Sequence, residues 1–290
     1  MPTWKTVGIL SVLGASIMWA LEPIFAKLSF QTADVLNTFA ARIFFGLTII
    51  TIYTLLKSPR TLKVGSEKIK WLIYLSLAAT LFADFIYTYA FTKVMVINAV
   101  VIGHIQPIFI VILGYFFLKS DRLTKFDYLG IIFMITAGIL VSTRTVENLK
   151  NLKFGTFGDL LVLSATFAWA TTAITTRKYL KDLPAQVIAF YRFLFAGVGF
   201  FLYLMLNHGI KITSIYQILL GLVIGIGTIL YYEGLKRIKA AQVSALELST
   251  PFFATFLGYV ILKERFTAEQ FLGLLFLLAG IYFISKKEEV

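Results

Sequence analysis

The chain has 290 residues, of which 59% are hydrophobic and only 14% charged, and it contains no cysteine. Soluble domains average about 25% charged residues, so this composition excludes a soluble domain, and the missing cysteines exclude disulfides and thiolate metal sites. The net charge of +12 would suggest nucleic acid for a soluble protein, but the basic residues lie mainly in short loops between apolar runs, so we expect lipid headgroups instead.

Ten apolar runs follow one another along the chain, and each is close to the length of about 20 residues that crosses a bilayer. The first run is too long for the apolar part of a signal peptide. We therefore expect an all-α integral membrane protein with ten transmembrane helices, over residues 7–30, 34–56, 71–92, 95–118, 125–143, 157–178, 184–206, 215–236, 240–262 and 268–285.

The sequence repeats itself at long range. Three landmarks recur at offsets of 150, 150 and 144 residues, namely Trp19 as Trp169, Arg42 as Arg192 and Pro107 as Pro251. Each copy holds five spans, and because five is odd the second copy enters the bilayer from the opposite side. A duplicated and inverted set of helices is typical of secondary transporters. We expect two inverted five-helix repeats over 1–143 and 157–285, with a linker at 144–156 and a tail at 286–290.

The distribution of Lys and Arg predicts the orientation. With the N-terminus inside, the inner loops receive about twice as many basic residues as the outer loops, as the positive-inside rule requires. The bias also reverses between corresponding loops in every pair but the last. The loop after the second span, for example, is rich in lysine, and its counterpart after the seventh span is not. We expect a multi-pass protein of the cell membrane with both termini in the cytoplasm.

The order and spacing of these landmarks resemble the drug/metabolite transporter superfamily, in particular its EamA-like branch of ten-helix carriers. The matching residues are Trp19 and Lys27 with their echo Trp169 and Arg177, the arginines Arg42 and Arg192, and the patterns Ala99, Pro107, Leu118-Lys119 and Ala245, Pro251, Leu262-Lys263-Glu264-Arg265. The first unit departs from the family's Leu-x-Glu-Arg ending, with Ser120-Asp121-Arg122. The resemblance covers essentially the whole chain, and it implies export or uptake of a small metabolite by alternating access without fixing the substrate.

Ionisable side chains inside the spans are candidate functional groups, because burying them in a membrane is costly. Glu22, Asp84 and His104 are expected in the outer half of the membrane, and Glu233 and Glu247 in the inner half. By depth, we expect Arg42 to serve the outer group and Arg192 the inner group.

A structural reading competes with the functional one, since Arg–carboxylate pairs can simply hold helices together. We favour it for Glu233, which precedes Lys236 and Arg237 by three and four residues. For Glu22 we favour function, because Pro23 is expected to open the helix and because the equivalent residue is Thr172. For Glu247 both readings stay open.

The leading hypothesis is a monomeric secondary carrier for a small metabolite that carries an amine or is zwitterionic, such as an amino acid. We expect substrate contacts from Trp19, Glu22, Asp84, Tyr87, His104, Gln106, Trp169, Thr172 and Glu247, and proton coupling at Glu22, Asp84 or His104. Gating or structural roles are expected for Pro23, Arg42, Pro107, Arg192 and Pro251.

No cofactor and no metal are expected, because the chain has only two histidines and no nucleotide-binding loop. The alternatives are a membrane enzyme acting on lipid or peptide, and a channel. The enzyme would need a clustered nucleophile and base, and the channel fits poorly with inverted repeats. Gly221 and Gly225, in Gly-x-x-x-Gly spacing, indicate close helix packing within the monomer.

Overall fold

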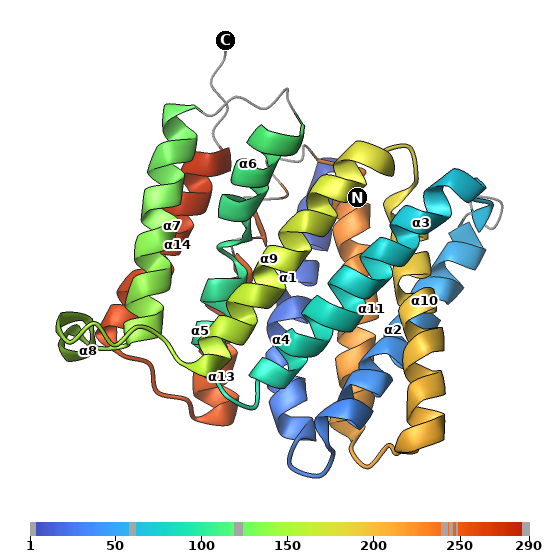
Figure 1. The fold of residues 1–290 in the computed structure, drawn as a ribbon, viewed down its shortest axis with the longest axis horizontal. Helices are drawn as coiled ribbons and strands as arrows, with labels where there is room; N and C mark the ends of the chain where they lie inside the picture. Colours follow the sequence, from blue (N-terminus) through green and yellow to red (C-terminus); the bar gives the residue numbers. More distant parts are fainter. Residues whose placement is uncertain are drawn as a thin grey trace.

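The computed structural model describes residues 4–57, 62–118, 124–238, 243, 246–247 and 249–285. These residues form helices joined by short connections, and none of them forms a strand (Figure 1). The first half of the chain contributes α1 (Trp4–Ser29), α2 (Val35–Lys57), α3 (Ser66–Leu75), η2 (Ser76–Asp84), α4 (Phe85–Ala90), α5 (Val96–Gly103), α6 (Gln106–Phe117) and α7 (Lys125–Thr143). The second half contributes α8 (Val146–Lys150), α9 (Phe157–Tyr179), α10 (Ala185–Asn207), α11 (Ile215–Leu235), α13 (Ser249–Leu262) and α14 (Ala268–Ser285).

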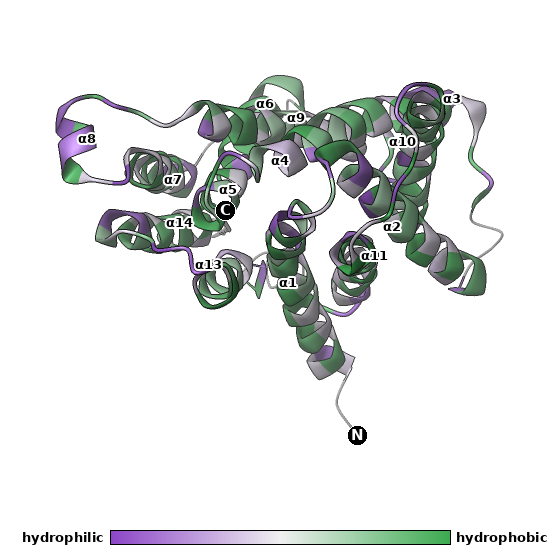
Figure 2. Cartoon of the chain, turned by 90° about the horizontal axis from the view of Figure 1, so that it is seen from below, coloured by the Kyte–Doolittle hydropathy of each residue, from purple (hydrophilic) through white to green (hydrophobic). Residues whose placement is uncertain are grey.

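The expected all-α membrane fold is confirmed. Eight helical stretches are long and apolar enough to cross a membrane, and two shorter apolar helices, Ser249–Leu262 and Ala268–Ile284, complete the ten spans. Hydrophobic residues cover the lengths of the helices, while hydrophilic ones gather at their ends and in the connections (Figure 2). The third span begins earlier than expected, at Ser66, and the expected tail 286–290 lies outside the described residues.

Helices of the two halves are interleaved in space. The helix α1 packs against α11 and α13, α14 packs against α7, and α2 packs against α10 and α11, so the main contacts join one repeat to the other. Two glycines of α11 allow its close approach to α2, as expected. A Cβ atom at Gly221 would lie 2.7 Å from the carbonyl oxygen of Ala41, and one at Gly225 would lie 2.7 Å from the Cβ of Ile49.

Two spans of the first repeat depart from a regular α-helix. The third span contains the π-helix η2 between α3 and α4, and π-helical turns often mark functional positions. The fourth span is interrupted at His104 and Ile105, after which Pro107 lies in the first turn of α6. Proline suits a first turn because the amide hydrogens there have no partner within the helix. The bend expected at Pro107 therefore takes the form of a break between α5 and α6.

The expected opening at Pro23 is wrong. The proline is buried, and α1 runs without interruption from Trp4 to Ser29. One missing amide donor is tolerated here because α11 and α13 pack along this helix and hold it in place. Pro251, the counterpart of Pro107 in the second repeat, lies buried near the start of α13.

Candidate functional site

A cavity of about 710 Å³ lies between the helices of the two repeats. All nine residues expected to contact substrate line it: Trp19, Glu22, Asp84, Tyr87, His104, Gln106, Trp169, Thr172 and Glu247. Arg42, Pro107 and Arg192 also line it, whereas Pro23 and Pro251 are buried within their helices. The nine residues selected from the sequence therefore line a single cavity, while their roles in substrate binding stay predictions.

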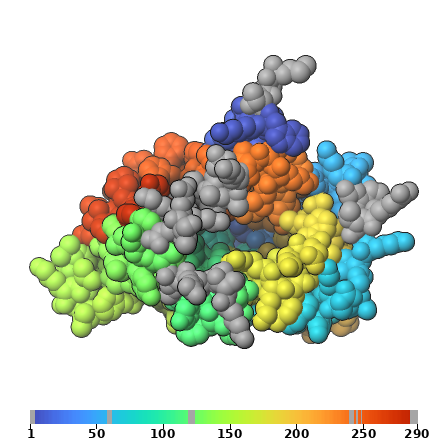
Figure 3. All heavy atoms as spheres, turned by 90° about the horizontal axis from the view of Figure 1, so that it is seen from above, coloured from blue at the N-terminus to red at the C-terminus, as the bar shows by residue number. Residues whose placement is uncertain are grey.

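The cavity opens toward one face of the molecule. Its lining includes Thr176, Ala185 and Tyr232, which lie close to the end of α9, the start of α10 and the end of α11. The space-filling view onto this face shows a hollow at the centre (Figure 3). The connections on the opposite face, 30–34, 91–95 and 208–214, contribute no lining residue. The cavity is thus reached from the face that carries the start of α1.

A chain of ion pairs lies along one wall of the cavity, and we call its four charged members the Asp84 cluster. The Nε atom of Arg42 donates to Glu22 Oε1 at 2.9 Å, and Arg42 Nη1 donates to Asp84 Oδ2 at 3.1 Å. Arg192 pairs with the same Asp84 oxygen from the other side. Two carboxylates and two guanidiniums thus compensate one another, and the cluster connects α1, α2, η2 and α10.

Further hydrogen bonds hold Asp84 and Arg192 in this arrangement. Trp169 Nε1 donates to Asp84 Oδ1 at 2.9 Å, and Arg192 Nε donates to Thr80 Oγ1 at 2.8 Å. The side chain of Asp84 is 2% exposed. A carboxylate this deeply buried needs such a full set of donors, because an unpaired buried charge is strongly unfavourable.

The expected partner of Arg192 is wrong. We expected this arginine to serve the inner carboxylates, but it pairs with Asp84, which we expected to be served by Arg42 alone. Because α10 packs against η2, the long guanidinium side chain reaches across the difference in depth. As a result, both arginines are used by the same cluster.

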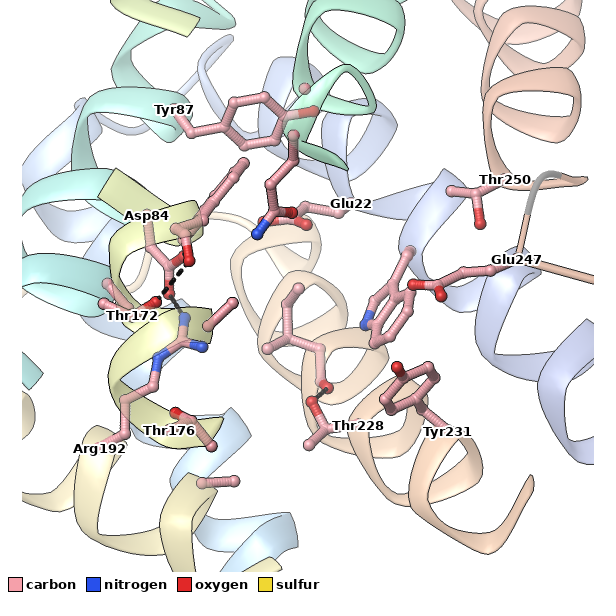
Figure 4. Close-up of a pocket in the computed structure, with 18 of the residues that line it drawn as sticks. Glu22, Asp84, Tyr87, Thr172, Thr176, Arg192, Thr228, Tyr231, Glu247 and Thr250 are labelled. Carbon is pink, nitrogen blue, oxygen red and sulfur yellow. Dashed lines mark hydrogen bonds and ion pairs between the residues drawn. The ribbon is translucent and has the colours of Figure 1, made fainter. Parts of the chain in front are cut away.

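Glu247 lies on the other side of the cavity from Asp84 and Arg192 (Figure 4). In the part of the chain that the structure describes, its carboxylate has no hydrogen bond and no ion pair. Tyr231 and Thr250 lie beside it in the close-up. The Trp19 ring is 5.2 Å from that of Tyr231, centroid to centroid. Glu247 thus faces aromatic rings and a hydroxyl rather than a cation.

His104 occupies the break between α5 and α6. Its Nδ1 atom lies 2.7 Å from the carbonyl oxygen of Val100. Since a carbonyl oxygen can only accept, Nδ1 carries the hydrogen, and Nε2 is the acceptor of the neutral ring. The imidazole therefore has one nitrogen committed to the backbone, while its side chain lines the cavity with Gln106.

The ion pairs expected for Glu233 are present, while its structural role stays a prediction. Its carboxylate pairs with Arg237, accepts a hydrogen bond from Tyr53 and lies 3.3 Å from Lys236 Nζ. These partners surround it outside the cavity lining, at the end of α11.

The face opposite the opening carries another charged link, which sequence reasoning missed. Lys27 Nζ lies 2.6 Å from Glu264 Oε1 and donates to the carbonyl of Val94 at 2.6 Å. The second oxygen of Glu264 accepts from the amide of Val96 at 2.7 Å. This latch, formed by Lys27, Glu264 and the backbone at Val94 and Val96, ties α1 to the connections before α5 and after α13. The position of Lys27 at a span's end and the acidic residue in the Leu-x-Glu-Arg ending were the available signals.

Other lining residues were also missed, namely Thr176, Thr228, Tyr231, Tyr232 and Thr250. Thr228 and Tyr231 are three residues apart in the eighth span and so share a helix face, which was a usable signal. Their side chains carry no charge at neutral pH. The prediction started from ionisable side chains, which are costly to bury in a membrane, and so it did not include them.

Comparison with known proteins identifies relatives along the whole chain. The EamA-like transporter family matches residues 6–143 and 156–286. The uncharacterized transporter sll1164 of Synechocystis sp. is 28% identical over 206 residues, which cover 66% of this chain but 58% of that protein. The uncharacterized transporter YoaV of Bacillus subtilis is 20% identical over 94% of this chain and 95% of its own length. The uncharacterized inner membrane transporter YhbE of Escherichia coli is 26% identical over 86% of this chain and 79% of its own.

A solved structure shares the fold. The crystal structure of a protein that is 15% identical in sequence superimposes with a TM-score of 0.67, covering 96% of both chains. At this level of identity the likeness concerns the arrangement of the helices alone. The resemblance expected from the repeated landmarks is confirmed by the family match.

Proposed function

This chain belongs to the EamA-like transporter family, and on that premise we propose that it is a secondary carrier that moves a small amine-bearing or zwitterionic metabolite, such as an amino acid, by alternating access. The observation that carries this proposal is the cavity between the repeats, with charged and aromatic side chains at its walls and an opening at one face. Carriers bind substrate in such a space near the middle of the membrane. Proton coupling through a carboxylate or His104 is part of the proposal.

The orientation follows from charge. The face onto which the cavity opens carries the start of α1 and most of the lysines and arginines in connections, so we assign it to the cytoplasm, together with both termini. The cavity then faces inward. The two repeats are taken as 1–143 and 157–285, and α8 falls in the connection 144–156 between them.

Two features supply the parts of an alternating-access cycle. The latch of Lys27 and Glu264 holds the outer face closed, and opening it would give the outward-facing state. The break at His104 and Ile105, next to Pro107, gives the fourth span a point of bending. The closed outer face supports a carrier rather than a channel, and we propose that the protein works as a monomer.

The test is counterflow in proteoliposomes made with the purified protein. Vesicles are preloaded with one unlabelled compound from each of four classes (amino acids, organic amines, organic anions and sugars), and uptake of the labelled compound is followed. We expect transient accumulation for an amine or a zwitterion. Absence of counterflow in every class would refute the carrier, and steady uptake without counterflow would indicate a channel.

A further inference from the structure

We propose that Glu247 forms a cation site of its own, separate from the Asp84 cluster, which binds the ammonium group of an organic amine and holds a proton when that ligand is absent. This inference rests on the proposed carrier function and assigns the substrate's cationic group to a particular place. It moves proton coupling away from Glu22, Asp84 and His104, where the sequence suggested it.

The charged side chains of the cavity lining are the first observation that supports this site. Its charged side chains are Glu22, Arg42, Asp84, Arg192 and Glu247. The first four compensate one another through the ion pairs of the Asp84 cluster. Glu247 has no such partner among the residues that the structure describes. An ionised carboxylate without a partner is costly away from water, so this group favours either a proton or a bound cation.

The aromatic side chain next to Glu247 is the second observation that supports this site. Tyr231 lies beside Glu247 in the close-up. Its ring packs against that of Trp19, with centroids 5.2 Å apart and a tilt of 46°, so an aromatic pair adjoins the carboxylate. Aromatic faces attract ammonium groups within about 6 Å of the ring centre. A carboxylate flanked by such rings suits an organic cation better than a hydrated metal ion, because the alkyl parts of the cation contact the rings.

An unpartnered hydroxyl is the third observation at this site. Thr250 lies beside Glu247 in the close-up and lines the same cavity. It is 2% exposed, and its Oγ1 atom has no hydrogen-bond partner within the described ranges. Most buried hydroxyls are satisfied, so an unsatisfied one beside Glu247 indicates a missing partner, and its oxygen can accept a hydrogen bond. The N–H groups of an ammonium ion would supply it.

Among the described residues, the neighbouring ionisable groups do not compensate Glu247. Helix α1 offers Glu22 and Lys27, which are paired with Arg42 and Glu264, and Lys5, which is exposed near its start. Helix α11 offers the neutral hydroxyls of Tyr216, Tyr231 and Tyr232, together with Glu233, which is paired with Arg237 and Lys236. Helix α5 carries no ionisable side chain before His104, whose Nδ1 is bonded to Val100. Each of these groups is therefore paired, neutral or remote.

The binding step balances as a simple exchange. A protonated Glu247 carboxyl loses its O–H proton to water in the open cavity, and the resulting carboxylate pairs with the incoming ammonium ion. One positive charge enters the site and one leaves it. Ligand binding and proton binding are therefore linked, and the ligand binds more tightly as the pH rises toward full ionisation of the carboxyl.

The test uses the full-length purified protein in detergent and three small probes: methylammonium, tetramethylammonium and the uncharged tert-butanol, which matches tetramethylammonium in size. Binding is measured by calorimetry, and proton release is followed with an indicator dye in weak buffer. We expect the wild type to release up to one proton per bound cation, with an apparent affinity that rises up to tenfold per pH unit in acidic solution. Tighter binding of methylammonium would indicate use of the Thr250 hydroxyl, and tighter binding of tetramethylammonium would indicate a site dominated by the rings.

The variants separate this site from the rest of the cavity. Glu247→Gln should abolish proton release and weaken cation binding at least tenfold, while Glu247→Asp should retain proton release. Tyr231→Leu should weaken tetramethylammonium binding about three- to tenfold with proton release intact. The matched control is Glu233→Gln, which changes a paired carboxylate on α11 and should behave as wild type.

Three results would overturn the inference: proton release from Glu247→Gln equal to that of the wild type, pH-independent binding in the wild type, or equal affinity for tert-butanol and the cations. If Glu247→Gln still showed counterflow with undiminished rate for the wild-type substrate, the cation site would be refuted and the carrier would stand. If the proton release matched our expectation but no compound gave counterflow, the carrier would be refuted and the cation site would stand.

Discussion

The two tryptophans that recur at an offset of 150 residues have different surroundings. Trp169 donates a hydrogen bond to Asp84, whose carboxylate is also held by both arginines. Trp19 packs against Tyr231 beside Glu247, which has no partner among the residues described. Repetition thus supplies the same scaffold twice, and residues that do not recur decide what each copy does. Glu247 illustrates this, since its equivalent at an offset of 144 is Gly103.

The comparison predicts that the two carboxylates respond in opposite ways to neutralisation. The largest effect is expected for Asp84→Asn, because it leaves the buried Arg42 and the partly buried Arg192 without their shared counter-charge. We expect a loss of about 3–5 kcal/mol in the free energy of unfolding, together with loss of transport. Thermal unfolding in detergent measures it. An unfolding temperature equal to that of the wild type would show that the Asp84 cluster does not hold the helices.

Glu247→Gln should leave the fold intact and change transport instead. Neutralising a partly buried carboxylate that has no partner among the described residues costs little stability. It also deletes the group that exchanges a proton for the substrate cation. We expect net transport to fall at least tenfold and its pH dependence to disappear, measured as uptake into proteoliposomes across a pH series. A pH profile parallel to that of the wild type would place coupling elsewhere, and Glu233→Gln serves as the control.

The variant Lys27→Met tests whether the latch keeps the outer face closed. We expect a smaller effect than for the two carboxylate variants. Breaking a half-buried, charge-assisted link of this kind shifts the balance between inward- and outward-facing states by about 1–3 kcal/mol. Because the chain has no cysteine, a single Val100→Cys reporter at the cavity wall gives labelling without background. We expect faster reaction with an impermeant thiol reagent from outside in the Lys27→Met protein. Equal rates with and without Lys27 would show that the latch does not keep this face closed.

Glu233→Gln should have the smallest effect. Its carboxylate is paired at the end of α11 and lies outside the cavity lining. Partly exposed ion pairs contribute about 0–1 kcal/mol, so we expect a slight decrease in stability and unchanged counterflow. A loss of counterflow as large as that of Glu247→Gln would remove the distinction between paired and unpaired carboxylates on which the comparison depends.

The fold could be predicted closely because the length of an apolar run is a local property of the sequence. The expected span 125–143 coincides with α7, and 157–178 differs from α9 by one residue. The topology could be predicted from the repeat. Each copy has five spans, an odd number, so the second copy must enter the membrane from the opposite side. The main differences lie in the third and fourth spans, where a π-helix and a break depend on packing that no periodicity records.

The members of the site could also be predicted, because ionisable side chains at membrane depth must avoid lipid. Their partners could not. Sequence gives the depth of Arg192 but neither the direction of its side chain nor its reach, so its pairing with Asp84 was missed. Likewise, the proline at position 23 indicates a lost hydrogen bond, and only the packing around α1 shows that the helix continues.

The most direct test of the distinction between the Asp84 cluster and Glu247 is infrared spectroscopy of the ligand-free protein in mildly acidic solution. A protonated carboxyl group gives a C=O stretching band that an ion-paired carboxylate does not. We predict such a band in the wild type and in Glu233→Gln, its loss in Glu247→Gln, and its decrease when methylammonium is added. A band that persists unchanged in Glu247→Gln would contradict the account.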